Sequence, residues 1–260
     1  RDRETGAETR RNALGLSLGY GYDGVRIATA LEYRVDETES PVDASVSERR
    51  TWLLKNSLKY QINPDWRLIG KLNYADSESS LGEFFDGRYT EAVIGYAYRP
   101  VAHDRLNMLF KYQYFYNVPT AEQQSTVGTA AEFIQKSHVF SIDAIYDLNP
   151  RWSVGGKYAY LLGQVSMERE NPEFFDSRAH LYVARADWRF ARNWDALFGL
   201  RLLDLPDAGD RRSGALAALY WHMGKNIKLG VGYNFTDFSD DLTDLDYDSR
   251  GVFINLVGKM

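Results

Sequence analysis

The sequence predicts an all-β protein: a transmembrane, antiparallel, up-and-down β-barrel of about 12–14 strands. Its segments alternate in chemistry. Across residues 66–74, for example, apolar and aromatic residues occupy the even-numbered positions, while Arg, Lys and Asn recur at the odd-numbered positions. We call each such set of alternate positions a parity. Because successive side chains of a strand point to opposite faces, each such segment has one apolar and one polar face. Tyr and Trp near the ends of the apolar face are typical of a face that meets lipid.

The composition fits this fold and excludes others. A mean hydropathy of -0.44, with no run near the ~18–20 apolar residues of a spanning helix, excludes a helical membrane protein. The 18 Tyr and 14% aromatic residues are high for a soluble domain and suit two aromatic girdles. The absence of Cys excludes disulfide frameworks and thiolate metal sites. The net charge of -5 argues against a nucleic-acid partner.

The alternation recurs in thirteen successive segments. A soluble barrel such as a lipocalin shares this pattern, but it turns its apolar parity inward and needs only about eight strands. We therefore expect the membrane barrel to occupy residues 11–260 and residues 1–10 to be a lead-in or a loop from an upstream region. The expected strands are 11–22, 25–37, 49–62, 66–78, 87–99, 105–117, 134–148, 151–165, 177–191, 194–204, 212–223, 227–238 and 249–260.

The connections between these segments alternate in length. Short turns on one side and long loops on the other are typical of bacterial outer-membrane barrels, with the turns periplasmic and the loops extracellular. The sequence therefore predicts an outer-membrane location. The tight turns, rich in Gly, Asn, Asp and Pro, are 23–24, 63–65, 101–104, 149–150, 192–193 and 224–226. The long loops are 38–48, 79–86, 118–133, 166–176, 205–211 and 239–248.

The strand count is odd, whereas bacterial single-chain barrels normally have an even number of strands. We prefer fourteen strands, with one before residue 1; the alternative is twelve, with residues 1–22 as a plug or lead-in. The sequence begins with Arg1 and shows no signal-peptide pattern. We therefore expect the barrel to be part of a longer polypeptide.

The final residues carry a family resemblance. Residues 228–248, KLGVGYNFTDFSDDLTDLDYD, and 251–260, GVFINLVGKM, resemble the end of the C-terminal outer-membrane barrel domain of large Gram-negative surface proteins. The resemblance implies a domain that anchors or exports an N-terminal region. It also implies that the barrel assembly machinery reads the last strand, where Met260 replaces the expected aromatic residue.

The polar parity predicts a basic lumen. Three interpretations remain open: a pore that favours anions because its low-dielectric wall focuses the field, a salt-bridged interior closed to solutes, or a lumen that grips an acidic linker. The predicted basic lining is Arg26, Arg34, Lys55, Lys59, Arg67, Lys71, Lys111, Lys157, Arg185, Arg189, Arg201 and Lys228. The predicted acidic lining is Glu32, Glu91, Asp143, Asp147, Asp187 and Asp195. The predicted membrane-interface aromatics are Trp66, Trp152 and Trp194.

The loops suggest little further chemistry. Residues 239–248 are acidic, and oxygen-rich loops can bind calcium, but their spacing does not match an EF-hand. A solvated acidic loop is the default, with Asp240, Asp241, Asp244, Asp246 and Asp248 as weak metal candidates. The similar clusters 83–86 and 173–176 each hold two Phe between carboxylates; they are expected to pack a loop or to cap the barrel mouth. No cofactor is predicted.

Catalysis is not expected either. His180 lies on the lipid-facing parity with Ser166 and Ser177 nearby in sequence, the residue types of an outer-membrane lipid hydrolase. However, no motif supplies the nucleophile, base and orienting group that such catalysis needs. We place His138 and His222 at the lipid or interface boundary and His103 in a periplasmic turn.

The function predicted first is therefore an anchor or export domain, and the alternative is a diffusion porin with a basic lumen. A lipid hydrolase comes third. The predicted partners are the lipid bilayer, lipopolysaccharide, the barrel assembly machinery and an N-terminal passenger or plug.

Overall fold

The described residues form a single antiparallel sheet of thirteen strands, each paired with its neighbour along the chain. The computed structural model describes residues 8–39, 45–82, 86–118, 134–168, 171–224, 227–236, 238, 242 and 250–258. The strands are β1 (Glu8–Tyr22), β2 (Val25–Glu39), β3 (Val46–Gln61), β4 (Trp66–Ser79), β5 (Gly87–Tyr98), β6 (Leu106–Val118), β7 (Ile134–Asn149), β8 (Trp152–Ser166), β9 (Phe175–Ala191), β10 (Trp194–Leu205), β11 (Asp210–Met223), β12 (Ile227–Asn234) and β13 (Gly251–Gly258). These strands confirm the predicted all-β, antiparallel, up-and-down barrel architecture.

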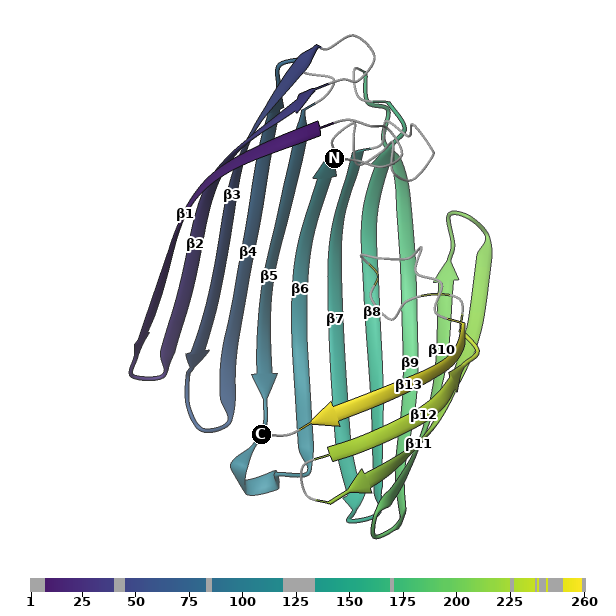
Figure 1. Cartoon of the computed structure of the whole chain (residues 1–260). Coiled ribbons are helices and arrows are strands. Elements are labelled where there is room, and N and C mark those ends of the chain that lie inside the picture. Colours follow the sequence, from purple (N-terminus) through teal and green to yellow (C-terminus); the bar gives the residue numbers. More distant parts are fainter. Residues whose placement is uncertain are drawn as a thin grey trace.

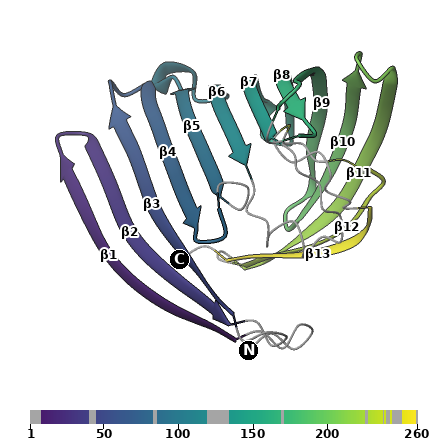
Figure 2. The ribbon, with the colours of Figure 1, turned by 90° about the horizontal axis from the view of Figure 1, so that it is seen from above.

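The sheet is strongly curved. Figure 1 shows the tight turns at its lower end, where the short 3₁₀ helix η2 (Val101–His103) joins β5 to β6. Figure 2, seen from above, shows β12 and β13 curling across the open side of the curve. Among the described strands, β1 pairs only with β2, and β13 only with β12. No helix in the described ranges is long and apolar enough to span a membrane.

The tight turns form where the sequence predicts them. Asp23 and Gly24 join β1 to β2 with φ angles of 42° and 78°, the left-handed conformation that a two-residue hairpin turn requires. At the β7–β8 turn, the Asn149 side-chain oxygen accepts hydrogen bonds from the backbone N–H groups of Arg151 (2.9 Å) and Trp152 (3.1 Å). The Asn side chain thus replaces backbone partners that a reversing chain loses.

Some strand ends differ from the prediction. β1 begins at Glu8, so residues 8–10 belong to the sheet and not to a lead-in. β12 ends at Asn234, four residues earlier than expected. The strand stops there because Phe238, which is fully buried, packs against other strands instead of continuing the ladder. The fourteenth strand stays a prediction.

One face of the sheet is apolar along its whole width, and we call it the outer face. On β1 it carries Leu14, Leu16 and Leu18, whose side chains are 79%, 62% and 65% exposed. Contiguous apolar surface of this extent is rare on soluble monomers. Hydrocarbon is therefore the solvent that suits this face.

Aromatic pairs line the tight-turn end of the outer face. Trp66 contacts Tyr98 of the neighbouring strand, with tilted rings whose centroids are 4.5 Å apart. Trp152 and Trp188 lie nearly parallel at 5.3 Å, and Trp194 faces Trp221 at 6.1 Å. Indole rings prefer the boundary between hydrocarbon and water, so this row suits the level of one membrane interface.

The opposite face, which we call the concave face, lies inside the curve. Phe238 and Leu242, from the β12–β13 connection, pack against side chains of this face on β7 to β10. Phe238 and Leu242 contact strands as distant in the sheet as β7, and only the inside of the bend formed by the strands (Figure 2) brings such residues together. The polar parity of the strands therefore faces the lumen.

Candidate anion site in the lumen

The predicted lining residues all lie on the concave face. Residues directly opposite each other in antiparallel strands share a face, and alternate residues within one strand do so too. Arg26 of β2 is directly opposite Lys59 of β3, and the pairs of the following strands extend this face across the sheet. On this face it places Arg26, Arg34, Lys55, Lys59, Arg67, Lys71, Lys111, Lys157, Arg185, Arg189, Arg201 and Lys228, with the acidic Glu32, Glu91, Asp143, Asp147, Asp187 and Asp195.

Several of these charges neutralise one another. Arg185 forms an ion pair with Asp187 at 2.7 Å on the same strand. At the tight-turn end, Asp195 accepts hydrogen bonds from Lys228 Nζ at 2.9 Å and Arg189 Nε at 3.4 Å. On β9 to β12, part of the polar lining is therefore a salt-bridged wall.

The strands β2 to β4 differ. Arg26, Lys55, Lys59 and Arg67 are exposed on the concave face and form no ion pair with any residue in the described ranges. Arg26 and Lys59 are directly opposite in the register, an arrangement of like charges that destabilises a sheet. The result is a patch of uncompensated positive charge at the tight-turn half of the lumen wall.

A groove accompanies this patch. Its volume is about 620 Å³, and it opens on the concave face of β1 to β4. It exists because β1 and β2 contribute only small side chains there, while β3 and β4 contribute long cationic and polar ones. An added Cβ at Gly19, for example, meets nothing within 4 Å. The concave-face residues that line the groove are Ser17, Gly19, Ala28, Ala30, Lys55, Ser57, Lys59, Ile69, Lys71 and Asn73.

One carboxylate borders the groove, and its acceptor positions are occupied. Glu91 accepts hydrogen bonds from Lys71 Nζ (2.9 Å), Asn73 Nδ2 (2.9 Å), Tyr89 Oη (3.1 Å) and Gln113 Nε2 (3.4 Å). Four donors leave it little capacity to attract a further cation. Glu91 therefore fixes Lys71 and Asn73 at the edge of the groove, and the charges of Lys55 and Lys59 remain available to an anion.

Toward the long-loop end, part of the concave face is not polar, which corrects the prediction of a polar lining throughout. Phe238 and Leu242 are 0% and 2% exposed. They pack on an apolar patch formed by Val139, Ala159, Leu161, Ala179, Leu181 and Leu203. Leu242 was expected in a solvated extracellular loop; burying it removes apolar surface from water. The signal in the sequence is the apolar residues on the polar parity of these strands.

The histidines divide between the two faces. His222 was predicted at the lipid or interface boundary; it lies near the tight-turn end but on the concave face, with its Nε2 2.6 Å from Asp195. His138 is on the outer face beside Tyr112, and His103 ends η2 at the tight-turn end. The alternation within β11 could have placed His222 correctly, since adjacent residues of a strand point to opposite faces and Trp221 is on the outer face.

His180 does not sit in a catalytic arrangement. Its Nδ1 lies 3.0 Å from the Tyr158 hydroxyl on the outer face. Ser177 is on the opposite face of the same strand, and Ser166 donates its hydroxyl hydrogen bond to the backbone carbonyl of Glu168. No described serine is therefore paired with this imidazole as a nucleophile would be.

The remaining candidates lie largely outside the described residues. These include the assembly residue Met260 and the acidic metal candidates Asp240, Asp241, Asp244, Asp246 and Asp248. Within the described ranges, no group of three or more His, Cys, Asp or Glu could hold a metal ion. Of the Phe pairs, Phe174 lies under the Lys136 ammonium at 3.8 Å, a contact of the outer rim and not of the lumen.

The lipid-facing belt, the polar concave face and the up-and-down strand order together define an outer-membrane β-barrel fold. No protein family and no curated protein matches the sequence. Solved structures do match the fold. The siderophore receptor PirA from Pseudomonas aeruginosa matches with a TM-score of 0.57 at 12% identity, over 87% of this chain and 41% of its own.

Two further receptors give the same result. The ferric enterobactin receptor PfeA matches with a TM-score of 0.60 at 6% identity, over 89% of this chain and 42% of its own. BauA, the ferric preacinetobactin receptor from Acinetobacter baumannii, matches with a TM-score of 0.55 at 10% identity, over 94% of this chain and 49% of its own. The chain spans less than half the length of each. What it shares with them is the fold of outer-membrane β-barrel channels and transporters.

Proposed function

We propose that the protein is a porin-like barrel of the bacterial outer membrane that lets small anionic solutes cross, and that the groove on β1 to β4 is where they bind. The observation that carries this proposal is the uncompensated charge of Arg26, Lys55, Lys59 and Arg67 beside a groove of about 620 Å³. Opposed like charges are costly to keep in a sheet. They become favourable when an anion lies between them, because each cation then has an opposite charge within reach.

Two parts of the lumen wall would act differently on a solute. The cationic groove lies at the tight-turn half of β1 to β4, and its positive potential would concentrate anions at that wall. The apolar contact of Phe238 and Leu242 narrows the space on the other side of the curve, against β7 to β10. A solute moving along the lumen would therefore be directed toward the cationic wall.

Planar-bilayer recording of the purified protein tests the proposal. A reversal potential in a KCl gradient that favours chloride, reduced by added phosphate or a small carboxylate, is the expected result. The absence of conductance, or a preference for potassium, would contradict it. The anchor for a larger surface protein stays a prediction, as do lipopolysaccharide, the assembly machinery and an N-terminal passenger as partners.

A further inference from the structure

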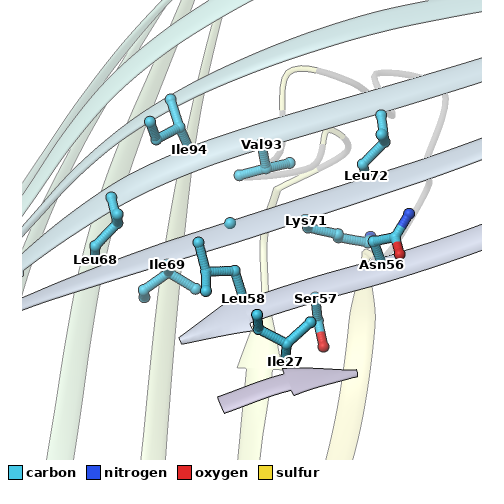
Figure 3. A pocket seen from close by; sticks show the side chains of 11 residues that line it. Ile27, Asn56, Ser57, Leu58, Leu68, Ile69, Lys71, Leu72, Val93 and Ile94 are labelled. Carbon is cyan, nitrogen blue, oxygen red and sulfur yellow. The ribbon is translucent and has the colours of Figure 1, made fainter. Parts of the chain in front are cut away.

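A groove also opens on the outer face, and Figure 3 shows the side chains that line it. Gly70, in the middle of β4, is part of its floor. The volume of the groove is about 320 Å³ and its surface is almost wholly apolar. The hollow exists because Gly70 has no side chain, while its neighbours on adjoining strands carry large ones. An added Cβ there would lie 3.3 Å from the Leu58 Cβ. The outer-face side chains around it are Ile27, Leu58, Leu68, Leu72 and Ile94.

Two polar side chains interrupt the apolar surface here: Asn56 and, directly opposite it on β2, Thr29. Asn56 lies at the edge of the groove, with its carboxamide beside Leu72 (Figure 3). On the outer face of β3 it is midway between Trp52 and Tyr60, the aromatic residues near the two ends of the apolar belt. Its side chain has no hydrogen bond to any residue in the described part of the chain. An amide held in hydrocarbon without a hydrogen-bond partner is unfavourable.

The chemistry of a carboxamide selects its partner. Lipid tails offer neither donors nor acceptors, whereas a second carboxamide offers both. Across a two-fold axis each Nδ2 donates to the other Oδ1, so two identical Asn side chains satisfy each other. We propose that this face joins two copies of the chain, related by a two-fold axis along the membrane normal that passes beside Asn56.

The strand register gives this contact a matching shape. Ile27, Leu58, Gly70 and Ile94 are directly opposite one another in a row across β2 to β5. An axis beside β3 places β2 of each copy, which carries Ile27, near β4 of the other, which carries Gly70. Ile27 is 42% exposed on the outer face, and the Gly70 hollow offers it space. The contact occurs twice, as a two-fold interface requires.

Cysteine cross-linking in outer membranes tests the proposal, because the chain has no cysteine of its own. Asn56→Cys places one thiol beside the proposed axis. Leu200→Cys is the matched control, since Leu200 is 65% exposed on the outer face of the distant strand β10. We expect mild oxidation to produce about tenfold more disulfide-linked dimer at position 56 than at position 200. Equal cross-linking at the two positions would overturn the proposal.

Two further variants separate a dimer from a lipid-filled groove. Asn56→Leu suits hydrocarbon and keeps the strand apolar, so it is expected to fold and to sediment as a monomer in detergent. Asn56→Gln keeps the self-complementary amide and should retain the dimer. A dimer unchanged by Asn56→Leu, or a wild-type monomer that retains an acyl chain in native mass spectrometry, would show that the groove does not join two copies.

Discussion

Replacing Lys55 and Lys59 together with glutamine removes two exposed charges of the cationic groove and keeps side chains of similar length. Neither lysine forms an ion pair within the described ranges, so the double variant leaves no carboxylate newly unpaired there. We therefore expect the barrel to fold and insert normally. The change should appear in ion selectivity, because the potential at the groove is lowered.

The magnitude follows from Coulomb's law. An anion about 6 Å from one ammonium group gains ~0.7 kcal/mol at the permittivity of water and ~3 kcal/mol at an effective permittivity near 20. Two lysines at the lower limit contribute ~1.4 kcal/mol, which corresponds to about a tenfold change in anion occupancy. The screening length is ~10 Å at 0.1 M salt but ~3 Å at 1 M. The difference between wild type and variant should therefore shrink sharply in concentrated KCl.

The assay is the reversal potential of single barrels across a dilute KCl gradient. Lys136→Gln is the control. It removes one positive charge, where the double variant removes two, and this charge lies on the outer face over the Phe174 ring. The expected result is a large loss of chloride preference in the Lys55→Gln/Lys59→Gln variant and little change in the control. Equal shifts in both proteins, or a double variant with unchanged selectivity, would refute the proposed role of the groove.

Three other predictions follow from single contacts. Trp152→Ala removes the stack on Trp188 and should lower the free energy of unfolding in lipid vesicles by about 1–2 kcal/mol; an unchanged urea midpoint would contradict it. Phe238→Ala empties a fully buried position and should cost about 3 kcal/mol in the same assay. The Arg178 guanidinium lowers the pKa of Asp207 in the β10–β11 turn. A lowered pKa gives a contribution that is present above the ordinary pKa and lost as the carboxylate protonates. Proteolysis of this turn should therefore rise only below pH ~4, and Asp207→Asn should be cleaved equally at neutral and acid pH.

The sequence predicts the strands and their faces well, because both depend on local chemistry. The two-residue period places residues such as Lys71 and Glu91 on one face whatever their partners are. The turn at Asn149 likewise needs only that side chain and the backbone N–H groups two and three residues later. Strand ends were less accurate. The end of β12 at Asn234 depends on where Phe238 packs, and that depends on strands far away in the sequence.

The candidate site could be predicted only in part. The sequence indicates a basic lumen, but it does not say which cations are neutralised. Lys71 has its partner Glu91 twenty residues away, and Arg26 lies opposite Lys59. Those relations depend on cross-strand register, which the sequence pattern alone does not fix to the residue. The hydrogen bond between His222 and Asp195 likewise depends on the register between two strands.

The alternating pattern of residues is enough to predict a β-barrel with one face for lipid and one for water, because the side-chain period of a strand is a local property. The remaining features depend on contacts between strands. Register sets which charges cancel, so a salt-bridged wall on β9 to β12 and a cationic groove on β1 to β4 arise from similar strands. Curvature brings Phe238 and Leu242 onto strands that are distant in the sheet, since only the inside of a bend lets such segments meet.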